Sequence, residues 1–206
     1  MFRDRTDAGE KLARLLRDRG VRADLVLAIP RGGLPIGRPV ADALDAPLDV
    51  AVAKKLGAPG NPELAIGAAA SDGSLWLNED AIDQLGVPDG YVERERRRAA
   101  ETAREKEDAY REGDPPDVAG RSVVLVDDGV ATGATVNACL RMLAERGAEH
   151  IVLAVPVGPP NARERLVGDA DEVVVLESPP RFRAVGQFYE RFDQVSDEEA
   201  MSYLDR

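Results

Sequence analysis

Residues 123–135 read VVLVDDGVATGAT, and this stretch decides the fold class of the chain. Its first four residues are all apolar, as expected for a central strand of a parallel sheet that is buried on both faces. Asp127 and Asp128 follow the strand directly, and a loop of small and hydroxyl-bearing residues then leads into a helix near Ala134. This order places the loop at the carboxyl edge of an open α/β sheet, which is where ligands bind in such folds.

The same alternation of strand and helix continues on both sides of this stretch. Apolar runs predict further strands at residues 24–29, 47–53, 151–155 and 172–176. Periodic patterns predict helices at residues 6–19, 34–44, 88–112, 134–146 and 160–167, the first capped by Thr6. The turn-rich residues 57–62 should form a loop, and residues 64–70 and 74–77 two strands of a small flap. We therefore predict one α/β domain over residues 1–206, with a central, mainly parallel sheet flanked by helices.

Composition excludes several classes of protein. The formal net charge is −11 and no basic stripe is present, so nucleic acid is not expected as a partner. A single cysteine, Cys139, allows no disulfide framework. The charged N-terminus and the absence of a long apolar run predict a cytoplasmic protein without a membrane span. The excess of acidic residues and the small number of lysines are also compatible with a protein from a saline cytoplasm.

The loop after Asp128 has the properties of a phosphate cradle. Small residues let backbone N–H groups approach an anion, Thr132 and Thr135 add hydroxyls, and the helix N-terminus adds its positive dipole end. Two carboxylates would repel a phosphate, unless they face another part of the ligand. Carboxylates accept hydrogen bonds from a vicinal diol and help to hold Mg²⁺. A ribose 5-phosphate has such a diol and such a phosphate, whereas an ordinary Asp-Asp-Gly turn would explain only a fragment of the pattern.

The stretch resembles the signature of the type I phosphoribosyltransferases, which use 5-phosphoribosyl 1-diphosphate. The resemblance implies a type I phosphoribosyltransferase fold, in which Asp127 and Asp128 bind the ribose hydroxyls and help to place Mg²⁺. It also implies that the loop binds the 5-phosphate, through Gly129, Ala131, Thr132, Gly133, Ala134 and Thr135.

Two further segments resemble parts of the same family. Residues 30–34, PRGGL, are similar to the loop that binds the diphosphate, where Arg31, Gly32 and Gly33 would contact the anion and a cis peptide is expected near Arg31-Gly32. Residues 54–63, KKLGAPGNPE, resemble the mobile active-site loop, in which Lys54 and Lys55 would neutralise diphosphate charge. Alternatively, Arg31 lies in an ordinary surface turn and the two lysines at a solvated strand end.

The reaction implied is displacement at ribose C1 by a nucleobase-like nitrogen acceptor, with release of diphosphate. Hypoxanthine–guanine members carry Asp directly before the Thr-Gly of the signature, whereas Ala131 stands here and is similar to adenine-type members. Residues 177–206 are the candidate hood or dimer segment. Their aromatic residues either stack on a base or pack a small core or a dimer contact. Stretches such as GAPGNPELAIGA and VGQFYE resemble a widespread group of phosphoribosyltransferases with undefined acceptors. A homodimer is implied by the resemblance alone.

Two other functions stay open. One is a regulatory protein that binds phosphoribosyl diphosphate without catalysing transfer. The other is a phosphohydrolase that uses the same Mg²⁺ site. The clustered cations Arg31, Lys54 and Lys55 favour the transferase.

Overall fold

A five-stranded parallel sheet forms the centre of the molecule. The computed structural model describes residues 1–111, 113–166 and 168–204. From one edge to the other, the sheet contains β2 (Leu48–Val50), β1 (Leu25–Ala28), β6 (Ser122–Val126), β7 (His150–Val157) and β8 (Glu172–Glu177). Every neighbouring pair is parallel. The predicted mainly parallel α/β sheet is therefore confirmed, with β6 at its centre.

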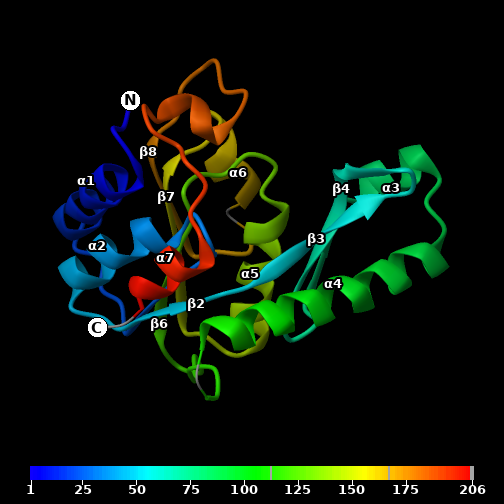
Figure 1. Cartoon of the computed structure of the whole chain (residues 1–206), viewed down its shortest axis with the longest axis horizontal. Coiled ribbons are helices and arrows are strands. Elements are labelled where there is room, and N and C mark those ends of the chain that lie inside the picture. The colour runs from blue at the N-terminus through cyan, green and yellow to red at the C-terminus, as the bar shows by residue number, and fades with distance from the viewer. Residues whose placement is uncertain (112, 167, 205–206) are drawn as a thin grey trace.

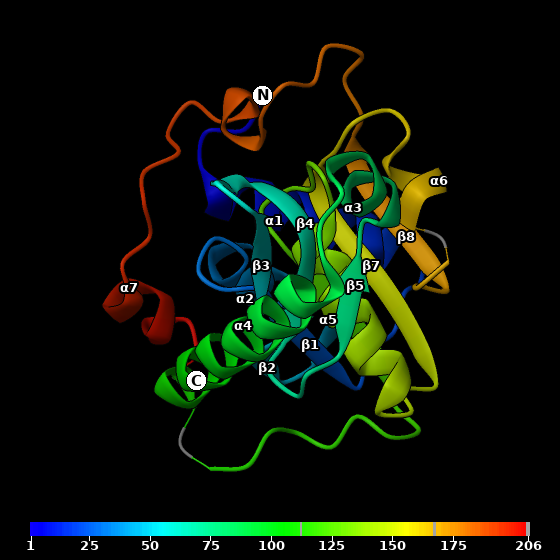
Figure 2. The same cartoon turned by 90° about the vertical axis from the view of Figure 1, so that its right-hand side faces the viewer.

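Helices cover both faces of this sheet (Figure 2). Helices α1 (Arg5–Asp18) and α2 (Leu34–Leu44) pack on one face, and α5 (Ala134–Glu145) and α6 (Ala162–Leu166) on the other. Successive strand residues point to opposite faces, so Val124 and Val126 join the core with α1 and α2, whereas Val123 and Leu125 join the core with α5. Burial on both faces explains why β6 is apolar over residues 123–126. None of the described helices is long and apolar enough to cross a bilayer.

The N-cap of the first helix lies two residues earlier than predicted. Asp4, not Thr6, is the N-cap of α1, and its carboxylate accepts a hydrogen bond from the backbone N–H of Asp7 at 3.0 Å. Both residue types are good caps. The carboxylate of Asp7 in turn accepts a hydrogen bond from the backbone N–H of Arg3 at 3.1 Å, which holds the chain just before the cap.

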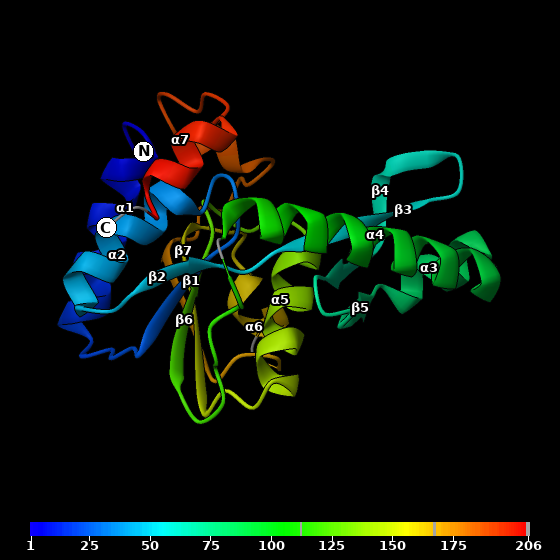
Figure 3. The same ribbon diagram turned by 60° about the horizontal axis from the view of Figure 1, so that its bottom comes forward.

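A second, antiparallel sheet projects from the side of the first (Figures 1 and 3). It consists of β3 (Ala53–Ala58), β4 (Asn61–Ala70) and β5 (Leu75–Leu77), in that spatial order. Helix α3 (Glu79–Leu85) and the long α4 (Asp89–Tyr110) follow it in the chain. Helix α4 packs along one face of this sheet and α5 reaches the other. The predicted flap strands are present, but α3 was not predicted, because it is short and buries none of its side chains.

The prediction of a loop at residues 57–62 was wrong, since these residues form the tip of the β3–β4 hairpin. The turn residues are confined to Pro59 and Gly60, where Gly60 has a φ of +74°. The register shifts at Gly57, and a Cβ there would lie 2.6 Å from the Cα of Pro62. Glycine and proline thus serve a tight turn and an irregular pairing within a hairpin.

The C-terminal stretch passes over the N-terminal residues and then returns to the helices. After β8 it contains a short 3₁₀ helix, η1 (Val185–Phe188), and ends with α7 (Asp197–Ser202), which lies near α2 and α4 (Figure 1). The backbone N–H of Phe2 donates to the carbonyl of Phe188 at 2.8 Å, and the rings of Phe2 and Tyr189 are 5.3 Å apart. The rings of Phe182 and Phe188 are 5.4 Å apart, and those of Tyr189 and Phe192 are 5.0 Å apart. The aromatic side chains of this stretch therefore pack on one another and on the N-terminus.

Candidate active site

Two loops meet at the carboxyl edge of the sheet, because they leave the neighbouring strands β1 and β6. Ala28 and Val126 are paired at the strand ends, and the backbone N–H of Ile29 donates to the carbonyl of Val126 at 2.9 Å. The loops then touch, since a Cβ at Gly32 would lie 2.1 Å from Oδ2 of Asp128. A side chain at position 32 would collide with this carboxylate. The cis peptide of the first loop is Pro30–Arg31, one bond before the expected position.

Asp127 and Asp128 lie in different environments, although they are adjacent. The Asp127 carboxylate accepts a hydrogen bond from the backbone N–H of Asp128 at 2.8 Å. Burial, and then the like charge of Asp128, raise the pKa of Asp127 well above its usual range. Burial also raises the pKa of Asp128, while the guanidinium of Arg5 opposes that rise. A cation bound beside Asp127 would therefore relieve an unfavourable concentration of negative charge.

Arg5 is a site residue that the sequence did not reveal. Its Nε donates to Oδ2 of Asp128 at 2.8 Å, and the two side chains are only 12% and 16% exposed. Its Nη1 donates to the carbonyl of Asp193 at 2.7 Å, and its guanidinium lies 3.8 Å from the centre of the Phe192 ring. No local motif marks an arginine at the start of a helix as a partner of a distant aspartate.

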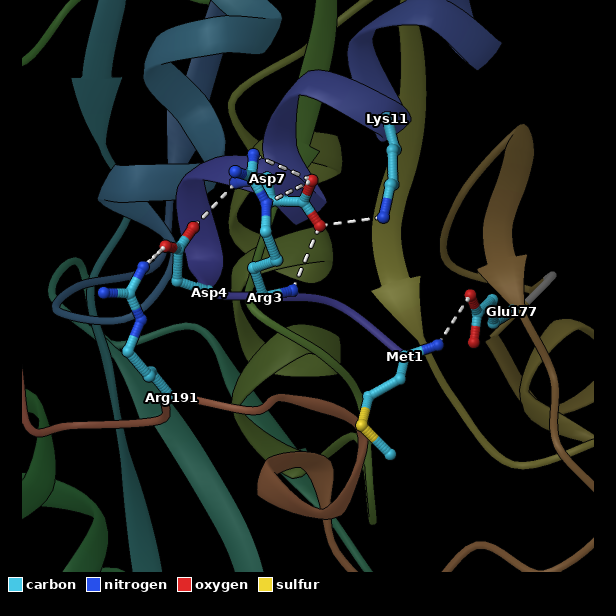
Figure 4. Close-up of polar contacts among 7 residues, drawn as sticks. All are labelled: Met1, Arg3, Asp4, Asp7, Lys11, Glu177 and Arg191. Carbon is cyan, nitrogen blue, oxygen red and sulfur yellow. Dashed lines mark hydrogen bonds and ion pairs between the residues drawn. The ribbon is translucent and has the colours of Figure 1, made fainter.

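A network of ion pairs fixes the segment that carries Arg5 (Figure 4). Asp7 accepts hydrogen bonds from the backbone N–H of Arg3 at 3.1 Å and from Nζ of Lys11 at 2.8 Å. Asp4 accepts one from Nη2 of Arg191 at 2.5 Å. The hydrogen bond from Lys11 is the main reason why the pKa of Asp7 lies below its usual value. The N-terminal segment is thus held against the C-terminal stretch, with Arg5 directed at Asp128.

Tyr189 holds the same loop from the other side. Its hydroxyl donates to the backbone carbonyl of Asp128 at 2.6 Å, and its ring is buried. Burial raises the pKa of this hydroxyl above its usual value, so it stays a donor. Tyr189 was predicted only as a ring that stacks on a base or packs a core, whereas here it also anchors the Asp128 backbone.

The candidate phosphate loop surrounds a cavity of about 160 Å³. Gly133 is the N-cap of α5 with a φ of +80°, a conformation that favours glycine. Arg165 of α6 donates to the carbonyl of Thr132 at 2.8 Å and supports the loop from outside. The lining contains every residue that the sequence assigned to the phosphate: Gly129, Ala131, Thr132, Gly133, Ala134 and Thr135. It also contains Asp127, Val130 and Val136 from the same stretch, Lys55 from β3 and Val185 from η1.

Lys54 and Lys55 do not act from the same side, because adjacent residues of a strand point to opposite faces. Lys55 lines the cavity of the phosphate loop. Lys54 lies on the same face of β3 as Leu56, which packs against α4. The charge of Lys54 helps to lower the pKa of Lys106 on that helix. The two lysines also lie within β3, not at the end of a strand as the sequence predicted.

The carboxylates fit a magnesium ion only with help from a ligand. Within residues 1–111, 113–166 and 168–204, no three His, Cys, Asp or Glu side chains gather closely enough to hold a metal. Asp128 is engaged by Arg5, whereas Asp127 keeps an oxygen that accepts no hydrogen bond from the described residues. Mg²⁺ commonly binds through one or two carboxylates plus substrate phosphates. The donor set therefore fits an ion that arrives with a phosphorylated ligand.

Comparison with known proteins gives a consistent picture. A family model described as the phosphoribosyl transferase domain matches residues 5–191. Two curated proteins of Mycobacterium tuberculosis, from strains CDC 1551 and H37Rv, are each named "putative phosphoribosyl transferase" and are 45% identical over 207 residues. The match covers all of this chain but 47% of each relative, so the chain spans about half their length. A crystal structure of a Thermus thermophilus protein is 44% identical, with a TM-score of 0.83 over 99% of this chain and 97% of that one.

Proposed function

The chain belongs to the type I phosphoribosyltransferase family, and from that premise we propose that it transfers the 5-phosphoribosyl group from 5-phosphoribosyl 1-diphosphate to a nitrogen acceptor. The observation that carries this proposal is the contact of the two loops at Gly32 and Asp128. It brings the candidate diphosphate loop next to the carboxylates that would bind the ribose. One ligand with a ribose between a phosphate and a diphosphate would satisfy both loops and the cavity beside them.

Each part of the site has a proposed role. The N–H groups and hydroxyls of residues 131–135, with Lys55, would bind the 5-phosphate in their cavity. Asp127 and Asp128 would accept hydrogen bonds from the ribose hydroxyls. Arg31, Gly32 and Gly33 would bind the diphosphate, with Lys54 nearby. Arg5 and Tyr189 would fix the side chain and the backbone of Asp128.

In the proposed reaction, the bond between ribose C1 and the diphosphate oxygen breaks, and the diphosphate leaves with the electron pair. The lone pair of the acceptor nitrogen forms the new bond to C1, and that nitrogen then loses its proton. Mg²⁺, held at Asp127 with the ligand, would supply charge neutralisation of the leaving diphosphate. The cations of the chain stabilise the same charge. Ala131 stands where hypoxanthine–guanine members carry Asp, which disfavours a 6-oxopurine acceptor.

The test is calorimetric titration with 5-phosphoribosyl 1-diphosphate and Mg²⁺, followed by a screen of nucleobases for diphosphate release. We expect binding, and release with one class of base. The double variant Asp127→Asn with Asp128→Asn should lose binding. Asp24→Asn is the control, because Asp24 accepts a hydrogen bond from the N–H of Ser122, at the opposite end of β6.

The outcomes separate the three candidate functions. Binding without turnover for any base would support a regulatory protein. Release of ribose phosphate without an acceptor would support a phosphohydrolase. If the wild type does not bind, or if the double variant binds as tightly as the wild type, the proposal is wrong.

A further inference from the structure

A second cavity, of about 360 Å³, opens beside the loop that follows β1. It lies between that loop, α4 and α7, and so draws on three separate parts of the chain. Arg31 comes from the loop, Lys106 and Tyr110 from α4, and Asp197 from α7. Ala109 and Met201 complete the lining. No sequence motif joins these residues, and the proposed roles above use only Arg31.

Two positive side chains line this cavity, Arg31 from the loop and Lys106 from α4. Nζ of Lys106 donates to the carbonyl of Pro30 at 3.2 Å, which places the ammonium against the loop that carries Arg31. Burial lowers the pKa of Lys106, and the charges of Arg31 and Lys54 lower it further. Like charges brought together in a partly buried place are unfavourable unless an anion joins them. The arrangement is therefore suited to bind an anion.

A carboxylate from α7 lies beside these two cations. Oδ2 of Asp197 lies 3.5 Å from Nη1 of Arg31, and Oδ1 accepts a hydrogen bond from the hydroxyl of Tyr110. The Asp197 side chain is 66% exposed, so its ion pair with Arg31 is weak and easily exchanged. Helix α7 has only six residues and lies outside both sheets. The exposed Asp197 side chain can rotate away from Arg31 while Ala200 of the same helix stays buried in the core.

We propose that Lys106 is a second cation for the diphosphate assigned above to the loop of Arg31, and that Asp197 competes with this diphosphate for Arg31. The inference rests on the proposed function for the identity of the ligand. A diphosphate suits the site because it carries several negative charges on two linked groups, which can meet Arg31 and Lys106 together. The ribose that bears it would lie at Asp128, which touches Gly32 beside Arg31. Lys106 thus becomes a binding residue for the diphosphate. Asp197 of α7 competes with the diphosphate for Arg31.

The experiment measures the dissociation constants of inorganic diphosphate and of ribose 5-phosphate by calorimetry, in the full chain. Lys106→Met removes the charge while keeping an unbranched apolar stem. Arg98→Met is the matched control, because it removes one positive charge from an exposed position of the same helix. Asp197→Asn removes the competing charge but can still accept the hydrogen bond from Tyr110. Circular dichroism and thermal unfolding check that each variant is folded.

Three results are expected together. Lys106→Met weakens diphosphate binding by about tenfold or more, as for loss of a charge-assisted hydrogen bond, and leaves ribose 5-phosphate binding unchanged. Arg98→Met binds both ligands like the wild type. Asp197→Asn binds diphosphate about two- to fivefold more tightly, the range for loss of a weak, exposed ion pair.

Failure of this inference can be told from failure of the proposed function. If the wild type binds diphosphate in a Lys106-dependent way but does not bind 5-phosphoribosyl 1-diphosphate, the proposed function is wrong and the anion site stands. If 5-phosphoribosyl 1-diphosphate binds but Lys106→Met binds diphosphate as the wild type does, the inference is wrong and the function stands. If Asp197→Asn binds diphosphate no more tightly than the wild type, Asp197 is not a competitor and that part of the inference is overturned.

Discussion

Nε of Arg5 donates to Oδ2 of Asp128 across 2.8 Å, which joins two residues that lie 123 positions apart in the chain. The pair ties the first turn of α1 to the loop after the central strand. Because both side chains are largely buried, neither can exchange its partner freely for water. The position of the Asp128 carboxylate, and hence of any ribose bound to it, depends on a residue far outside the stretch of residues 123–135.

We predict a measurable coupling between Arg5 and Asp128. Arg5→Met should lower the free energy of unfolding by about 1–3 kcal/mol, because it leaves a buried carboxylate without its charged donor. In a double-mutant cycle with Asp128→Asn, the coupling energy should be about 1–3 kcal/mol. Urea denaturation of the four proteins measures it. The cycle removes the separate contribution of Arg5 packing on Phe192.

A second cycle, between Arg3 and Asp7, provides the comparison. Arg3 is 68% exposed and its guanidinium lies 3.3 Å from the Asp7 carboxylate. Although Asp7 is only 10% exposed, the guanidinium of Arg3 is largely solvated, so this pair should couple by less than about 1 kcal/mol. A coupling for Arg5 and Asp128 no larger than that for Arg3 and Asp7 would contradict the role given to Arg5.

We predict that Gly32→Ala impairs the site more than the fold. The added Cβ would meet Oδ2 of Asp128 at 2.1 Å, so the carboxylate must leave the position in which it accepts the hydrogen bond from Arg5. Affinity for 5-phosphoribosyl 1-diphosphate should fall by about tenfold or more, as expected when a charged hydrogen bond is lost. Gly168→Ala is the control, because a Cβ at Gly168 would meet no atom of the described residues within 4 Å. The stability of this variant should change by less than about 0.5 kcal/mol. Wild-type affinity in Gly32→Ala would show that Asp128 does not bind the ligand.

The sequence predicted the sheet and its loops because their signals are local. A wholly apolar run, two carboxylates and a small-residue loop are contiguous in residues 123–135, and the structure places them on a strand, a turn and a helix start. The similar loop after β1 lies beside it because parallel neighbours end at the same edge. Where turn residues were abundant, at residues 57–62, the same local reasoning failed, because a hairpin uses few residues for its turn.

The supporting residues could not be found in this way, because only tertiary packing brings them to the site. Arg5, Lys106 and Tyr189 come from a first helix turn, a charged helix and a C-terminal stretch. One signal was available for Lys106. The chain contains lysine only at positions 11, 54, 55 and 106, and the last three gather near Arg31 and Asp127. Because nearly all other basic residues of the chain are arginines, the few lysines were a signal that three of them lie at one site.

We predict that the N-terminal network loses stability in acid through Asp7. Its folded-state pKa lies below the ordinary value of 3.8, chiefly because Lys11 donates to it. A lowered pKa means that Asp7 stabilises the fold above the unfolded-state pKa, and that this contribution disappears as the pH falls through the folded-state pKa. Asp7→Asn should therefore be less stable than the wild type at pH 7, with a difference that shrinks below about pH 4. Urea unfolding at several pH values measures both curves, and a constant difference would contradict the prediction.

We predict that the adjacent lysines of β3 serve different parts of the ligand. Lys55 lines the cavity of the phosphate loop, so Lys55→Met should weaken binding of ribose 5-phosphate. Lys54 acts on the α4 side, where its charge reaches Lys106, so Lys54→Met should weaken binding of inorganic diphosphate. Both side chains are exposed, and each loss should be about fivefold, the size of a solvated charge interaction. High salt should reduce both effects.

Each lysine variant is the control for the other, because the two substitutions remove the same charge from neighbouring positions of one strand. A general loss of positive potential would weaken both ligands equally in both variants. Two separate subsites would instead produce a crossed pattern, in which each variant loses one ligand and keeps the other. Calorimetry with the two ligands, each at low and high salt, distinguishes these cases. If both variants lose affinity for both ligands equally, the prediction is wrong. The two lysines would then act only through their combined positive charge, and the opposite directions of their side chains would have no bearing on binding.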